Sequence, residues 1–186
     1  MSSGTPGDLR QVDVDGVPAC WVPTTGRWAV ALLFGVGVRD ESLVVRGIDH
    51  LVEHLTVFGL DHRALEFNAH VSATATAFTV TGAAEEVQAF LDHVGTALDR
   101  LDDARLDLER RVLRTEARGR PRTLNGLHLD HRFGPNGLGL LESEELGLRW
   151  LGAGDLQSWI GTWFTAGNAA LAVVGLLCGM APDEVG

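Results

Sequence analysis

Two histidines and a glutamate lie close together in the segment RGIDHLVEHLTVFG. His50, Glu53 and His54 form the pattern HxxEH, and a helix over this segment puts both imidazoles on one face, one turn apart. Two neutral imidazoles so placed can bind one metal ion, and zinc suits such ligands. Glu53 is offset from them and is placed to take a proton from metal-bound water. The alternative interpretation is that both histidines are ordinary helix-surface residues.

Two glutamates further along the chain are candidates to complete such a site, because catalytic zinc needs a third protein ligand and an open position for water. Glu109 and Glu116 are seven residues apart, which is two helical turns, so they share one face. A carboxylate pair on the apolar side of a helix needs a cation or a donor. The alternative is that both are boundary residues that reach solvent or pair with Arg105 or Arg120. The opposite face carries Asp107, Arg110, Arg111, Arg114 and Arg118.

Apolar residues at spacings of three and four predict the helix that carries the HxxEH pattern, over 47–58. The same periodicity predicts helices over 83–101, 103–118 and 153–164. Alternating or β-branched runs predict strands over 11–14, 19–22, 28–38, 68–80 and 168–174, and 119–139 is mostly loop. This order favours an α+β fold, a mostly antiparallel sheet with helices packed on one face. The small, polar side chains of 68–80 suit a lightly covered sheet edge.

Composition indicates one globular domain. The chain has 186 residues, of which 45% are hydrophobic and 22% charged. We expect a flexible tail over 1–10 and a single domain over 11–186. The net charge is −10, and the basic residues are all arginines without a basic run, so nucleic acid and anionic membranes are not expected partners.

The two cysteines, Cys20 and Cys178, cannot form a disulfide framework or a CxxC metal site, and this usage is typical of a reducing compartment. The N-terminus has no apolar segment typical of a signal peptide. The apolar run 169–181 is too short to cross a bilayer. We therefore expect a cytoplasmic protein, and arginine without lysine suggests a bacterial gene of high GC content.

The segment RGIDHLVEHLTVFG resembles the signature of the M16 zinc metallopeptidases, the family of pitrilysin, insulinase and the mitochondrial processing peptidases. The segments VGVRDE, NAHVSATATAF and TAGNAALAVVG resemble other parts of the family's catalytic half. The resemblance implies that His50, His54 and Glu116 bind zinc, that Glu53 is the general base, and that Glu109 orients the site. It also implies the LuxS/MPP-like metallohydrolase fold.

In this family the substrate is an extended peptide, which the resemblance places along a strand edge at Asn68, Ala69 and His70. A second half normally faces the catalytic half, so the resemblance implies an M16-like partner subunit, a homodimer, or a sequence that is a fragment of a longer protein. Two features depart from the family. The chain between His54 and Asn68 is about a dozen residues shorter than expected, and the loop 119–140 lacks the usual aromatic and proline pattern.

Two other functions remain open. One is a structural or regulatory M16-like subunit without activity. The other, less favoured, is a small-molecule hydrolase or lyase on a related fold, since S-ribosylhomocysteinases also carry HxxEH. Those enzymes use a cysteine ligand, and neither Cys20 nor Cys178 has a comparable setting. His128 and His131 are expected to be a solvated pair, and Trp159 and Trp163 to lie in the core or an interface.

Overall fold

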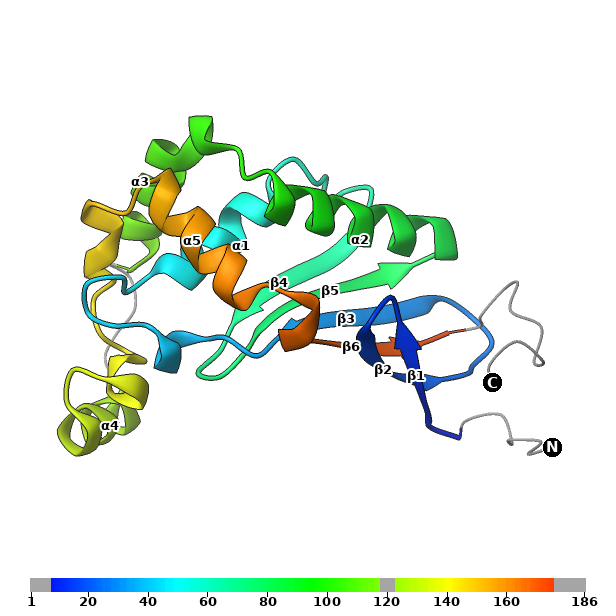
Figure 1. The fold of residues 1–186 in the computed structure, drawn as a ribbon, viewed down its shortest axis with the longest axis horizontal. Helices are drawn as coiled ribbons and strands as arrows, with labels where there is room; N and C mark the ends of the chain where they lie inside the picture. The colour runs from blue at the N-terminus through cyan, green and yellow to red at the C-terminus, as the bar shows by residue number, and fades with distance from the viewer. Residues whose placement is uncertain (1–7, 118–122, 176–186) are drawn as a thin grey trace.

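The computed structural model describes residues 8–117 and 123–175, which form a six-stranded mixed sheet with the strand order β1-β2-β6-β3-β5-β4 (Figure 1). Only β2 and β6 pair in parallel, and the other neighbours are antiparallel. The predicted mostly antiparallel sheet is therefore confirmed. The strands are β1 Arg10–Val14, β2 Val17–Val22, β3 Trp28–Phe34, β4 Glu66–Val71, β5 Thr76–Gly82 and β6 Ala169–Val174.

Helices cover one face of this sheet, as the α+β prediction requires, two of them packed directly on its strands and two packed on the first of these (Figure 1). They are α1 Ile48–Val57, α2 Ala84–Asp99, α3 Leu106–Ala117 and α5 Ala153–Trp163. A fifth helix, α4 Leu124–Phe133, lies beyond the end of the sheet and packs against the short 3-10 helix Gly137–Leu140. In the part of the chain that the structure describes, no helix is long and apolar enough to span a bilayer.

The core lies between the helices and one face of the sheet. Side chains alternate along β5, where Phe78 and Val80 are buried beneath the helices. From α1, Leu51 and Val52 are completely buried against them, and Leu55 nearly so. Burying three large apolar side chains contributes roughly 1.5–3 kcal/mol each. The helix with the HxxEH pattern is thus a fixed part of the core.

The prediction of one continuous strand over 68–80 is wrong, because the chain forms the hairpin β4–β5 there. Ser72 makes the turn: its Oγ accepts hydrogen bonds from the N–H groups of Thr74 and Ala75 and donates one to the Ala75 carbonyl. A serine turn of this kind needs neither glycine nor proline, so the sequence carries no strong turn signal. The hairpin still leaves β4 at the edge of the sheet, which confirms the predicted edge.

Two other boundaries differ from the predictions. The strand predicted over 28–38 ends at Phe34, and Gly37 then passes so close to the turn of the hairpin that a Cβ there would lie 2.6 Å from the Ser72 carbonyl oxygen. The predicted loop 119–139 contains α4, whose first turn is capped by the Thr123 hydroxyl accepting from the Gly126 N–H. Residues 1–7 of the predicted tail and Cys178 lie outside the described residues.

Candidate metal centre

The helix α1 presents His50, Glu53 and His54 on one side. The Nε2 atom of His50 lies 3.8 Å from Glu53 Oε2, and the two imidazole rings meet edge to face with their centroids 4.9 Å apart. One potential ligand atom from each residue lies within 4.8 Å of the others. The side chains are half-buried, so the group is neither sealed in the core nor spread over the surface.

The helix α3 brings the two predicted glutamates to His54. Glu109 Oε2 is 3.3 Å from His54 Nδ1, and Glu116 Oε2 is 3.9 Å from His54 Nε2. Glu109 is buried and also forms an ion pair with Arg105, one of the partners considered for it from the sequence. Glu116 is 44% exposed in its side chain. On the other side of α3, Asp107, Arg111 and Arg114 are exposed and Arg110 is half-buried, and these four residues line a surface hollow. Arg118 of the predicted charged face lies outside the described residues.

The donor set fits zinc in chemistry and in spacing. Two nitrogen atoms and carboxylate oxygens are its usual ligands, and tetrahedral zinc with bonds of about 2.0–2.1 Å holds two ligand atoms about 3.3 Å apart. Among the ligand candidates, His54 Nε2 and Glu116 Oε2 are 3.9 Å apart, within about 0.6 Å of that value.

Burial raises the pKa of the Glu53 carboxyl above its ordinary value, and the nearby Glu116 carboxylate adds to this. The imidazoles of His50, His54 and His70 oppose the shift. A carboxyl whose pKa is raised holds a proton more readily near neutral pH than an exposed glutamate does. Glu53 therefore has the electrostatic character of a proton acceptor.

The edge strand β4 runs beside this group. Asn68, Ala69 and His70 lie in its middle, and β4 pairs only with β5, so its other edge has no strand partner among the described residues. The helix α1 packs against β4, and the charge of His70 acts on Glu53. Ala69 is half-buried, whereas Asn68 and His70 are exposed. The structure thus brings the residues predicted to bind substrate next to the HxxEH helix.

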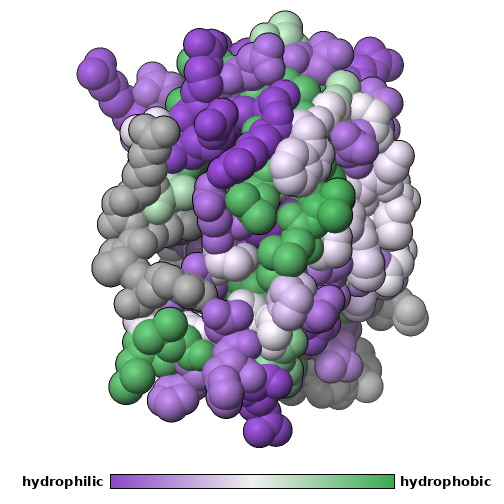
Figure 2. All heavy atoms as spheres, turned by 90° about the vertical axis from the view of Figure 1, so that its left-hand side faces the viewer, coloured by the Kyte–Doolittle hydropathy of each residue, from purple (hydrophilic) through white to green (hydrophobic). Residues whose placement is uncertain are grey.

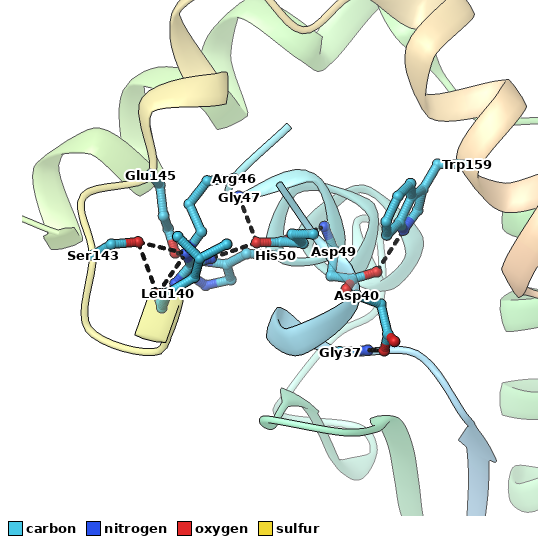
Figure 3. Close-up of polar contacts among 11 residues, drawn as sticks. Gly37, Asp40, Arg46, Gly47, Asp49, His50, Leu140, Ser143, Glu145 and Trp159 are labelled. Carbon is cyan, nitrogen blue, oxygen red and sulfur yellow. Dashed lines mark hydrogen bonds and ion pairs between the residues drawn. The ribbon is translucent and has the colours of Figure 1, made fainter. Parts of the chain in front are cut away.

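A loop that is distant in sequence contacts His50, and the sequence pattern does not predict this contact (Figure 3). Glu145 Oε1 lies 3.0 Å from His50 Nδ1, and the Arg46 guanidinium lies 3.7 Å from the same oxygen. Glu145 is buried, although it lies in an irregular segment with two other glutamates, Glu142 and Glu144. Because neither a helical nor a strand period applies to such a segment, the sequence carries no signal for this contact.

A second buried carboxyl lies behind the site. Asp49 is completely buried, and its Oδ1 accepts a hydrogen bond of 2.7 Å from Trp159 Nε1 (Figure 3). Burial, with the Glu41 carboxylate, raises the pKa of Asp49 to about 7. Trp159 packs against the core, which is one of the two settings predicted for it, and ties α5 to α1. His128 and His131 lie exposed on α4, as expected of solvated residues.

We predict that Trp159→Phe lowers the free energy of unfolding by about 1–3 kcal/mol, because it leaves the buried Asp49 carboxyl without its indole donor. Chemical denaturation of the purified protein measures this. Trp163→Phe is the matched control, since Trp163 lies one turn away and its indole makes no hydrogen bond to any of the described residues. Equal stability of the two variants would contradict the prediction.

Comparison of the sequence with family models, and with curated proteins, gives no match. Solved structures do match. A protease from Helicobacter pylori superposes with a TM-score of 0.75 at 21% identity, over 94% of this chain and 48% of that one. An M16-like peptidase from Alicyclobacillus acidocaldarius gives 0.71 at 16% identity, over 100% of this chain and 49% of that one. This chain has the fold of one half of an M16 peptidase.

These matches confirm the fold that the resemblance of the HxxEH segment predicted. This chain spans about half the length of these two proteins. An inactive M16 domain from Pseudomonas fluorescens matches as well, with a TM-score of 0.70 at 13% identity, over 92% of this chain and 47% of that one. The fold thus occurs in active and in inactive halves.

Proposed function

We propose that this chain is the catalytic half of a zinc-dependent M16 peptidase that cleaves extended peptides. The observation that carries the proposal is the convergence of His50, Glu53 and His54 on one side of α1, with Glu109 and Glu116 of α3 facing them. A half that serves only as a structural subunit has no use for such a costly group of half-buried charges.

In the proposed site, His50, His54 and Glu116 would hold the zinc ion. Bound zinc supplies a Lewis acid that polarises the scissile carbonyl and acidifies water. Glu53 takes the proton of the attacking water and passes it to the departing amine, a role that its raised pKa supports. Glu109 accepts from His54 Nδ1 and keeps that ring turned toward the site.

The substrate is proposed to bind as an additional strand along β4. The free edge of β4 offers backbone groups at Asn68, Ala69 and His70, and such pairing depends little on the side chains of the peptide. Because β4 packs against α1, which carries Glu53, a strand added at the free edge of β4 is proposed to bring the scissile bond to Glu53. This arrangement supports a peptidase of broad sequence tolerance rather than a small-molecule hydrolase.

A second M16-type half is the proposed partner, either a different subunit or a second copy of this chain. The supporting fact is that the two peptidases compared above are about twice as long. The end of the molecule that carries 41–47 and 140–150 also has a hydrophobic area (Figure 2). Leu43, Val44 and Trp150 of these segments are exposed, and exposed apolar surface of this kind is typical of protein contacts.

We also propose a bacterial cytoplasmic location and no nucleic-acid or membrane partner. Cys20 is a free, exposed thiol on β2, which is the state that a reducing compartment maintains. The net charge of −10 repels phosphate groups.

Zinc content tests the proposal most directly. We expect about one zinc per chain by elemental analysis of the unchanged protein, and far less in Glu116→Ala purified in parallel. Glu144→Ala is the matched control, because Glu144 is an exposed glutamate that pairs with Arg149. Absence of zinc from the unchanged protein, even after supplementation, would overturn the proposal and favour a structural M16-like subunit, for which the inactive Pseudomonas fluorescens domain is a precedent.

A further inference from the structure

We infer that Glu145 is a positioning residue of the metal centre, which fixes the tautomer and the orientation of His50. This inference deepens the proposed function and rests on it for the identity of the metal. It concerns a residue of the segment between α4 and α5, which is distant in sequence from the helices that carry the HxxEH and glutamate residues.

The hydrogen bond to His50 has one chemically consistent direction. An ionised carboxylate can only accept, so the 3.0 Å contact between Glu145 Oε1 and His50 Nδ1 requires the proton on Nδ1. In a neutral imidazole the lone pair then lies on Nε2, the atom that faces Glu53. The Glu145 side chain is 5% exposed and that of His50 12%, so water competes little for this bond.

His54 has the same arrangement, which argues against a coincidental contact at His50. Its Nδ1 lies 3.3 Å from Glu109 Oε2, and its Nε2 faces Glu116. Both histidines therefore have a carboxylate on Nδ1 and direct Nε2 to the same region. The two carboxylates come from different segments, α3 and the loop before α5. The shared arrangement therefore does not result from a repeated sequence motif.

A buried ion-pair network holds Glu145 in place. Arg46 donates to Glu41 Oε2 at 2.8 Å and to the Leu140 carbonyl at 3.0 Å, and it lies 3.7 Å from Glu145 Oε1 (Figure 3). Glu41 in turn accepts from the N–H groups at the start of α1, at Gly47 and Asp49. The start of the HxxEH helix and the Glu145 loop are thus joined through one guanidinium.

Backbone packing fixes the same loop. Gly47 has φ of +98°, and a Cβ on it would lie 2.9 Å from the Glu145 Cβ. Gly147 packs against the backbone of Arg46, and its N–H donates to the Arg46 carbonyl at 3.0 Å. Two glycines therefore allow the loop to approach α1 closely enough for Glu145 to reach His50. Burying the charges of Arg46, Glu41 and Glu145 costs desolvation energy that apolar residues would avoid. The orientation of His50 is a function that accounts for this cost.

The first test is the tautomer of His50 in the metal-free protein, read from ¹⁵N NMR of histidine-labelled samples. The inference requires the proton on Nδ1 in the unchanged protein and a mixture of tautomers in Glu145→Gln. Glu144→Gln, an exposed neighbour, should leave the His50 signals unchanged. A proton on Nε2 of His50 in the unchanged protein would overturn the inference without any variant being needed.

The second test is zinc affinity by competition with a chelator. Loss of such an outer carboxylate weakens metal binding by about 10–100-fold, which we expect for Glu145→Gln and not for Glu144→Gln. Wild-type affinity in Glu145→Gln, with the tautomer unchanged, would refute the positioning role. If the unchanged protein binds no zinc, the proposed function fails, and the His50 tautomer still decides whether Glu145 orients the ring.

Discussion

Glu53→Gln is expected to abolish peptide cleavage while leaving zinc bound. Glutamine has the size of glutamate and preserves the packing of α1, but its amide cannot take a proton from water. Loss of a general base lowers turnover by about 10²–10⁴-fold. The histidine nitrogens and Glu116 are untouched, so the zinc content should match that of the unchanged protein. Turnover of a fluorogenic peptide mixture and elemental analysis of the same sample measure both effects.

The matched control for this experiment is Glu85→Gln, which makes the same chemical change at an exposed position on α2. It should keep full activity and full zinc content. Because activity is expected to need a second M16-type half, the assay uses the assembly in which the unchanged chain is active. Unchanged turnover of Glu53→Gln in that assembly would exclude Glu53 as the base.

The helical parts of the site could be predicted from the sequence because a helix converts spacing into direction. His50 and His54, four residues apart, and Glu109 and Glu116, seven apart, each share a face by geometry alone. The structure adds what spacing cannot give, namely that α1 and α3 pack with these faces toward each other. The choice of facing surfaces depends on the whole core.

The irregular parts could not be predicted in the same way. Glu145 reaches His50 from 95 positions away through a loop, and its burial follows from two glycines and a buried arginine that the loop packs against. The Ser72 turn that divides 68–80 into two strands depends on side-chain hydrogen bonds. The Thr- and Ala-rich sequence of this segment does not predict them. The Glu145 contact is set by tertiary packing and the Ser72 turn by local side-chain hydrogen bonds, and neither produces a periodic pattern in the sequence.

His54→Ala is expected to lose zinc and, with it, all activity. His54 lies at the centre of the group: its Nε2 faces Glu116, its Nδ1 contacts Glu109, and its ring meets that of His50. Removing a ligand should weaken zinc binding by more than the roughly 10–100-fold that outer carboxylates contribute. Elemental analysis and chelator competition measure this, with His62→Ala as the control, because His62 is exposed and stacks on Phe67 instead.

Thermal unfolding separates loss of the metal from loss of the fold. A ligand that binds only the folded state stabilises it by about 4 kcal/mol at a thousand times its Kd. Added zinc should therefore raise the Tm of the unchanged protein and of His62→Ala but not that of His54→Ala. Without zinc, His54→Ala should unfold cooperatively, because the α1 residues that fill the core, Leu51, Val52 and Leu55, are unchanged. An equal zinc-dependent rise in Tm in His54→Ala would show that zinc binds elsewhere and would remove His54 from the site.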